Sequence, residues 1–139
     1  MDYKIEKNIV VAKLDHGANI FQDIKDILSE LDRNSGMVVS GIGMLKDFKL
    51  GYYNSKNGEY SWENFHEPME LVNLGGSISD EGTIHLHASI SGEDHMLRGG
   101  HLDNGTIFNV VEMVILVFDD VTLTRKYDKS RKMNLLSMR

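Results

Sequence analysis

The hydrophobic positions between Asn19 and Arg33 follow a helical period. Six apolar side chains recur at offsets that place them along one side of a helix with 3.6 residues per turn: Ile20, Phe21, Ile24, Ile27, Leu28 and Leu31. Polar residues fill the other side: Gln22, Asp23, Lys25, Asp26, Glu30 and Asp32. Gly36 supplies a stop shortly afterwards. The pattern predicts one long amphipathic helix, whose apolar stripe needs a sheet or another helix to cover it.

Most of the remaining chain consists of short segments rich in Val, Ile, Thr and aromatic residues, punctuated by Gly, Asn and Asp, which is typical of β-strands. The predicted strands are Ile5 to Leu14, Met37 to Tyr53, Met69 to Ile78, Thr83 to Ser91, Met96 to Leu102, Thr106 to Phe118 and Val121 to Tyr127.

Between two of these strands, Asp103-Asn104-Gly105 favours a hairpin turn, because Asn-Gly suits the two positive-φ positions of a type I′ turn. We therefore expect residues 96–102 and 106–118 to be antiparallel neighbours. Many adjacent strands with one helix predict a single α+β domain over residues 1–139. Its mainly antiparallel sheet carries the amphipathic helix.

Three histidines form a candidate metal site. His85 and His87 alternate with Ile84, Leu86 and Ala88, so strand periodicity places both imidazoles on one face. Two such imidazoles can chelate one ion at Zn–N distances of about 2.0–2.1 Å. His101 follows Gly99-Gly100 on the next predicted strand and becomes a third ligand if the strands pair. The alternative interpretation is an ordinary polar strand face.

The remaining histidines, His16, His66 and His95, have no partner at ligand spacing and are interpreted as surface or loop residues. Glu112 lies within the apolar run of residues 110–118, where a buried carboxylate is costly unless it is paired. It is a candidate fourth ligand, a hydrogen-bond acceptor behind a metal-bound imidazole, or a group at a subunit interface. A solvent-facing position on an edge strand is the alternative.

Composition narrows the chemistry. The chain of 139 residues has no Cys, so a metal site must be built from His and carboxylates. Its net charge is −6, which opposes general attraction to nucleic acids or anionic membranes. The charge is unevenly distributed: residues 125–139 carry six basic residues and one acid, whereas residues 1–124 carry nine basic and 20 acidic residues. Without a membrane-length apolar run or a signal-peptide pattern, we expect a cytoplasmic protein with no membrane partner.

Several short blocks occur in an order that resembles the PPC domain, the "plants and prokaryotes conserved" domain also called DUF296. They are Ser40-Gly41-Ile42-Gly43, Leu50-Gly51-Tyr52-Tyr53, Glu70-Leu71-Val72-Asn73-Leu74-Gly75-Gly76-Ser77-Ile78, His85-Leu86-His87-Ala88, Gly99-Gly100-His101-Leu102 and Glu112. The resemblance extends from about Leu14 to Leu135. It includes Arg125 to Asp128, which is similar to the family's Arg-x-x-Asp ending.

The resemblance implies an α+β homotrimer. It also implies that His85, His87 and His101, as in prokaryotic members, cluster and bind a divalent metal ion such as Zn²⁺. Plant members instead carry AT-hooks outside the domain, and this sequence has no Arg-Gly-Arg-Pro core. The family label favours a DNA-binding or regulatory role. The alternative is a metal-dependent enzyme of unknown substrate, with Glu112 as a base or as a partner of a ligand.

Overall fold

The computed structural model describes the backbone of residues 1–139 and the side chains of residues 1–80 and 82–139. Its elements, in chain order, are β1 (Asp2–Glu6), β2 (Ile9–Asp15), α1 (Ile20–Glu30), β3 (Gly36–Lys46), β4 (Phe48–Asn54), β5 (Glu59–Phe65), β6 (Met69–Ser79), the 3-10 turn η1 (Asp80–Gly82), β7 (Thr83–Ser91), β8 (Leu97–Asp103), β9 (Thr106–Val117), β10 (Leu123–Asp128) and β11 (Met133–Met138).

The predicted helix is present as α1. Asn19 caps its N-terminus, since its side chain accepts hydrogen bonds from the backbone N–H groups of Phe21 and Gln22 at 3.0 and 3.2 Å. The apolar stripe is buried: Ile20, Ile24 and Ile27 are fully covered and Leu28 is nearly so. The prediction was wrong for Asp23, which is buried with this stripe rather than exposed. Burial raises the pKa of its carboxyl group.

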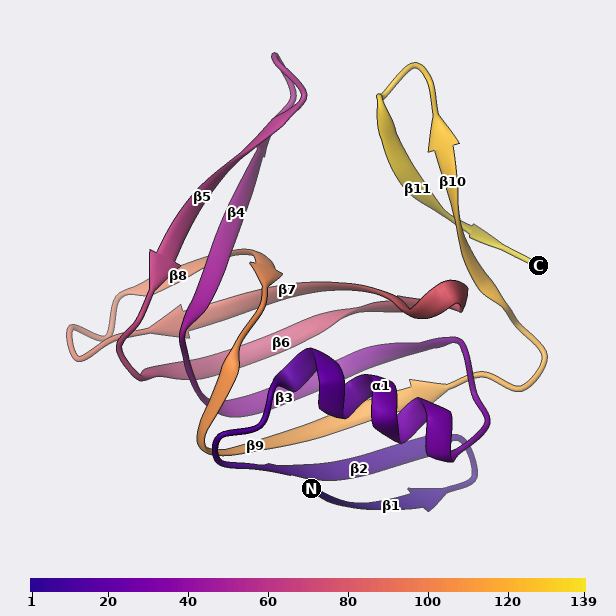
Figure 1. Ribbon diagram of the computed structural model, residues 1–139, viewed down its shortest axis with the longest axis horizontal. Helices are drawn as coiled ribbons and strands as arrows, with labels where there is room; N and C mark the ends of the chain where they lie inside the picture. The colour runs from indigo at the N-terminus through magenta and orange to yellow at the C-terminus, as the bar shows by residue number, and fades with distance from the viewer.

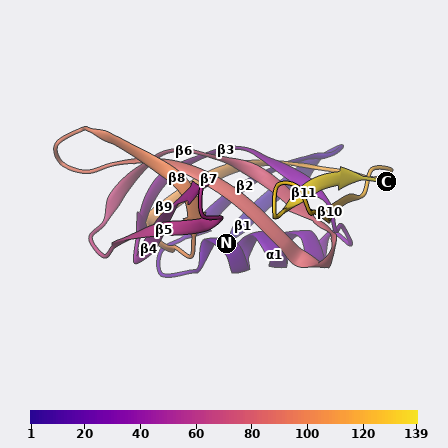
Figure 2. The same ribbon diagram turned by 90° about the horizontal axis from the view of Figure 1, so that it is seen from above.

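Nine strands form one sheet in the order β1-β2-β9-β3-β6-β7-β8-β4-β5, and every neighbouring pair is antiparallel. The helix lies along one face of this sheet, next to β9 and β2 (Figures 1 and 2). Its buried side chains share one core with those of the strands, among them Leu14, Leu74, Leu86 and Ile115. The predicted α+β class with a mainly antiparallel sheet is confirmed.

The predicted hairpin at Asp103-Asn104-Gly105 was wrong. Asn104 does adopt a positive φ, as a turn requires, but β8 and β9 do not pair. Both sides of β8 are already occupied, by β7 and by β4, so it has no free edge for β9. The chain instead crosses beneath the start of α1, where Gly105 O accepts from Ile20 N at 3.1 Å. Strand β9 then inserts between β2 and β3.

Some predicted strands have different limits. The segment from Met37 to Tyr53 is two strands, which separate at Asp47, a residue with φ of 50°. The segment from Ile5 to Leu14 is likewise divided, at Lys7 with φ of 57°. A positive φ at each position turns the chain between two extended segments. Strands β5 and β11 were not predicted.

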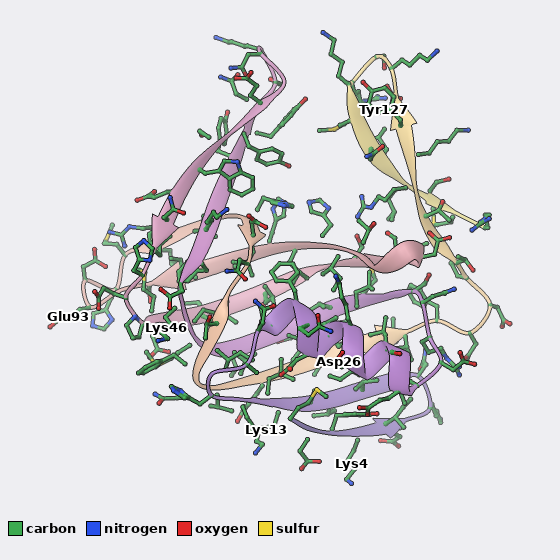
Figure 3. The ribbon with its side chains drawn as sticks, in the orientation of Figure 1. Lys4, Lys13, Asp26, Lys46, Glu93 and Tyr127 are labelled. Carbon is green, nitrogen blue, oxygen red and sulfur yellow. The ribbon has the colours of Figure 1, made fainter. Side chains whose placement is uncertain are left out.

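Strands β10 and β11 form a separate antiparallel hairpin that projects from the sheet (Figure 1). Its base is attached through Leu123, which is buried and whose N–H donates to Ser35 Oγ at 2.9 Å. Tyr127 lies on the projecting part, far from Lys4 and Lys13 at the other edge of the molecule (Figure 3).

Within the part of the chain that the structure describes, no helix has the length and apolar character needed to cross a membrane.

Candidate metal centre

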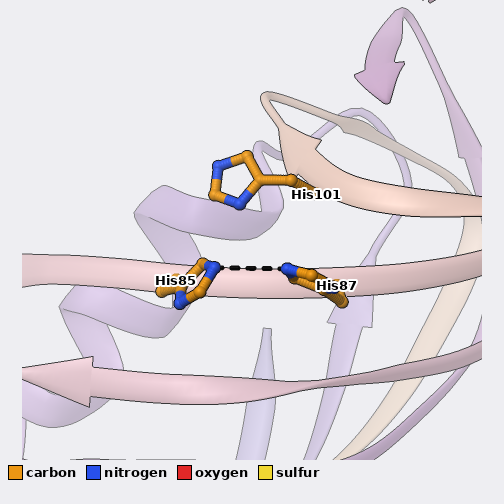
Figure 4. A group of neighbouring side chains, drawn as sticks. All are labelled: His85, His87 and His101. Atoms are coloured by element: carbon orange, nitrogen blue, oxygen red, sulfur yellow. Dashed lines mark hydrogen bonds between the residues drawn. The ribbon is translucent and has the colours of Figure 1, made fainter. Parts of the chain in front are cut away.

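Strand β7 holds two of the predicted ligands. Leu86, Ala88 and Ile90 are buried in the core, so alternation turns His85 and His87 to the opposite face, where His85 is half-buried and His87 is exposed. Their Nε2 atoms lie 3.2 Å apart (Figure 4). The polar face predicted for residues 83–91 is therefore formed as the sequence indicated.

Strand β8 brings the third histidine to the same place. It pairs antiparallel with β7, and His101 lies directly opposite His87 in the register. The His101 ring centroid is 4.9 Å from that of His85 and 5.7 Å from that of His87. One of its ring nitrogens points toward the other two imidazoles (Figure 4). The convergence of the three histidines is thus confirmed.

The geometry of the three imidazoles fits a tetrahedral metal ion. Zn–N bonds of about 2.0–2.1 Å at tetrahedral angles separate two ligand nitrogens by about 3.3 Å. The two Nε2 atoms of His85 and His87 already have this separation, at 3.2 Å. One nitrogen from each histidine lies within 4.8 Å of the others, so a small side-chain rotation of His101 completes the set. The Nδ1 atom of His101 is buried without a hydrogen-bond partner among the described residues, so no hydrogen bond competes with a metal ion for it.

The environment of His85 and His101 keeps these two imidazoles in the neutral form, which binds metals. Burial is the main factor that lowers the pKa of His85, to about 4, with smaller contributions from His101, Arg125 and His87. Burial also lowers the pKa of His101, followed by the effect of His87. A metal ligand must be neutral, because protonation uses the lone pair that binds the ion. Near pH 7, His85 and His101 are therefore available as ligands.

Two aromatic rings of β5 cover His101. The Tyr60 and Trp62 ring centroids lie 5.3 and 5.9 Å from that of His101. Gly51 of β4 makes this possible, because it lies between His101 and Trp62 in the register of the sheet. A Cβ atom at Gly51 would be 2.7 Å from Trp62 and 2.9 Å from Tyr60. The glycine of the Leu50-Gly51-Tyr52-Tyr53 block thus opens the space that these rings fill.

Glu112 is not part of this cluster. It is exposed on β9, and strands β3 and β6 lie between β9 and β7. Its register neighbours are Lys13 of β2 and Ile42 of β3. The structure therefore does not bring Glu112 to the three histidines within one chain, whereas its role at a subunit interface stays a prediction.

The other histidines have the predicted positions. His16, His66 and His95 are all exposed outside the strands. His16 Nδ1 accepts from Asn109 N at 2.9 Å, and His66 Nδ1 lies 3.3 Å from Asp47 Oδ1.

Sequence reasoning missed the residues around the cluster. Tyr60 and Trp62 alternate along β5 with polar residues, a period-2 signal that would have identified this strand. From the sequence, Arg125 belongs to the basic C-terminal segment and to the family's Arg-x-x-Asp ending, neither of which places it beside the histidines. In the structure its Nη2 donates to Ser77 Oγ at 2.6 Å, and Ser77 lies directly opposite His85 in the β6–β7 register.

Comparison with known families agrees with this fold and cluster. A family model described as the Plants and Prokaryotes Conserved (PCC) domain matches residues 1–119, which include all three histidines. The chain therefore belongs to the PCC domain family. The match ends before Arg125. A comparison with curated proteins finds no match.

Solved structures share the fold over almost the whole chain. A Bacteroides thetaiotaomicron protein named "putative DNA binding protein" is 25% identical, with a TM-score of 0.88 and coverage of 98% of this chain and 96% of its own. A metal-containing protein from Archaeoglobus fulgidus is 25% identical, with a TM-score of 0.81 and coverage of 96% and 95%. A plant- and prokaryote-conserved (PPC) protein from Pyrococcus horikoshii is 24% identical, with a TM-score of 0.81 and coverage of 98% and 94%.

Proposed function

We propose that this protein binds a divalent metal ion, Zn²⁺, through His85, His87 and His101. The observation that carries the proposal is the 3.2 Å separation of the Nε2 atoms of His85 and His87, with a nitrogen of His101 close to both. Imidazole nitrogens suit Zn²⁺ among the common divalent ions, and the chain has no Cys to compete for it. The metal-containing relative from Archaeoglobus supports the same interpretation.

Three protein ligands leave one tetrahedral position open. In such sites a bound Zn²⁺ acts as a Lewis acid and lowers the pKa of a coordinated water to about 7. The chain's own contribution is to hold three imidazoles on two paired strands, to keep His85 and His101 neutral, and to cover one side with Tyr60 and Trp62. If the protein is an enzyme, its general base is not Glu112 of the same chain, because that residue lies away from the three histidines.

The metal proposal is tested by elemental analysis of protein purified without a His-tag. We expect about one zinc per chain in the native protein and almost none in a triple variant with His85→Ala, His87→Ala and His101→Ala. The matched control carries His66→Ala and His95→Ala, which remove two exposed imidazoles outside the cluster. Equal zinc content in all three proteins would remove the claim.

The same proposal includes self-association. On the sheet face opposite the core, Ile9, Val11 and Ile42 are 44%, 58% and 48% exposed, an unusual density of large apolar side chains in solvent. Glu112 and Lys13 lie opposite each other on this face. A second copy of the chain would cover the apolar residues and place Glu112 at the interface. The number of three subunits in the proposed assembly comes from the family resemblance.

A DNA-binding role is the second candidate, favoured by the charge of the β10–β11 hairpin. Lys126, Lys129 and Lys132 are exposed there and belong to none of the ion pairs among the described residues. The rest of the chain repels phosphate, since residues 1–124 have a net charge of −11. Only this hairpin offers DNA a basic surface.

The DNA role is tested by the salt dependence of binding to AT-rich duplex. If the hairpin neutralises phosphates, affinity falls as salt rises, and replacing Lys126 and Lys129 by Gln reduces the slope of log K against log salt by about 2. The control replaces by Gln two lysines outside the hairpin, Lys4 at the opposite edge (Figure 3) and the exposed Lys25 of α1. Binding that is absent at about 0.15 M salt, or indifferent to salt, contradicts this role.

A further inference from the structure

A cleft of about 820 Å³ adjoins the three-histidine cluster. Its lining includes residues of the two projecting hairpins that Figure 1 shows, β4–β5 and β10–β11, together with His85 and His101. Tyr53 and Tyr60 contribute from one hairpin, and Arg125 and Lys132 from the other. The open coordination position of a bound metal would therefore have a volume beside it that is large enough for a small organic molecule.

Arg125 is a partly buried group in this cleft whose charge is not balanced, whereas Lys132, likewise outside the described ion pairs, is exposed. Its Nη2 donates to the neutral Ser77 Oγ, and its buried Nε has no partner among the described residues. No described carboxylate forms a salt bridge with it. By contrast, Arg131 and Arg139 of the same hairpin pair with Asp128 and Asp80. A partly buried guanidinium without an anion is costly, and burial accordingly lowers the pKa of Arg125.

Arg125 lies close to the proposed metal site. Its partner Ser77 is directly opposite His85 on the neighbouring strand, and adjacent strands are about 4.8 Å apart. A guanidinium and a divalent cation thus border one volume, with Lys132 as a further positive charge. Both groups favour carboxylate or phosphate oxygens, because the guanidinium donates in a planar fork and Zn²⁺ accepts an oxygen ligand.

We propose that this cleft binds a small organic anion, whose carboxylate or phosphate group pairs with Arg125 and occupies the open metal position. The proposal rests on the metal site proposed above. The rings of Tyr53 and Tyr60, with centroids 5.4 Å apart, give the organic part of the anion an aromatic wall. The anion also supplies the charge that neither the three neutral imidazoles nor the described neighbours of Arg125 provide.

The test uses zinc-loaded, untagged full-length protein and three probes: inorganic phosphate, phenyl phosphate and benzoate. Isothermal titration calorimetry measures affinity. The fluorescence of Trp62, the only tryptophan in the chain, reports events beside His101. We expect saturable binding of at least one probe, tighter for phenyl phosphate than for inorganic phosphate because the ring contacts the tyrosines. Comparison of phenyl phosphate with benzoate shows which anionic group the cleft prefers.

The decisive variant is Arg125→Gln, which keeps a polar side chain but removes the charged fork. We expect a loss of affinity of about 10-fold to 100-fold, as for other hydrogen bonds to charged groups. Arg125→Lys retains charge without the fork and should lie between. Arg131→Gln, on the same hairpin but paired with Asp128, is the matched control and should bind like the native protein. Zinc content and thermal melting of each variant show whether the fold and the metal site are intact.

The outcomes separate the two proposals. If the native protein binds no zinc, both fail. If it binds one zinc per chain but none of the probes, or if Arg125→Gln with normal zinc content binds them as tightly as the native protein, the anion proposal is overturned and the metal proposal stands. Binding that needs both zinc and Arg125 supports both.

Discussion

Adding one methyl group at Gly76 should disturb the proposed metal site, because it would push against the backbone of His85. A Cβ atom there would lie 2.0 Å from the backbone oxygen of His85 and 2.9 Å from Leu86 Cα. Both atoms belong to the backbone of β7, so no side-chain rotation can relieve the contact. Strands β6 and β7 would have to separate by about 1 Å at this point, because non-bonded carbon atoms settle about 3.5–4.0 Å apart.

The expected loss of stability follows from this displacement of the strands. Overpacking of a well-ordered interior costs about 1–3 kcal/mol, and a rigid backbone contact belongs in the upper part of that range. We therefore expect Gly76→Ala to lower the free energy of unfolding by about 2–3 kcal/mol and the melting temperature by about 6–15 °C. Moving the backbone of His85 also shifts a ligand. Loss of a group that orients a metal ligand typically costs about 10-fold to 100-fold in metal affinity, and we expect a loss of this order here.

The adjacent residue provides the control. At Gly75 a Cβ atom would meet only Val38 O, at an ordinary 3.7 Å, so Gly75→Ala should change stability by less than about 0.5 kcal/mol. Urea denaturation of the metal-free proteins measures stability without a contribution from zinc binding. Competition with a chromophoric chelator then measures zinc affinity. If Gly76→Ala and Gly75→Ala unfold at the same urea concentration and bind zinc equally, the packing argument is refuted.

Three further predictions concern acid, self-association and the core. As pH falls from about 6.5 to about 4, His85 takes up a proton in the unfolded state but not in the folded state, because its folded-state pKa is lowered to about 4. The free energy of unfolding of the metal-free protein, measured in urea, should therefore fall by about 1–2 kcal/mol, a figure reduced to allow for the partial exposure of His85. A His85→Asn variant with the same acid dependence would contradict this. Val11→Asp should reduce the molar mass measured by light scattering to that of a monomer, whereas Leu97→Asp, at another exposed apolar position, should leave the mass unchanged. An unchanged molar mass for Val11→Asp would reject the apolar face as the interface. Leu86→Ala should lower the free energy of unfolding in urea by about 2–5 kcal/mol, because this side chain is fully buried in the core, on the face of β7 opposite the two histidines. A loss below about 1 kcal/mol would be inconsistent with its burial.

The charge arrangement links the proposals. A metal ion held by three neutral imidazoles adds two positive charges beside Arg125, within a chain whose overall charge is −6. The cleft would therefore be a local positive site on an acidic protein, which favours small anions able to enter it. A long polyanion such as DNA would also be repelled by the acidic residues 1–124. The exposed lysines of the β10–β11 hairpin would therefore be its point of contact.

Local patterns were sufficient for the features that depend on a few neighbouring residues. The period of 3.6 residues identified α1, and the apolar stripe of this helix is buried as expected. Alternation along β7 placed His85 and His87 on one face, because successive side chains of a strand point to opposite sides whatever the strand pairs with. These properties are fixed by backbone geometry alone.

Only the tertiary structure decided which strands became neighbours. The Asn-Gly turn predicted that β8 pairs with β9, but β4 returns from an earlier part of the chain and takes that edge. The same non-local choice places Gly51 between His101 and Trp62, and brings Arg125 to Ser77 across 48 residues of sequence. Strand pairing depends on burying the whole sheet face at once, whereas a turn contributes only its own few residues. The histidine pair of β7 was therefore visible in the sequence, but the cleft around it was not.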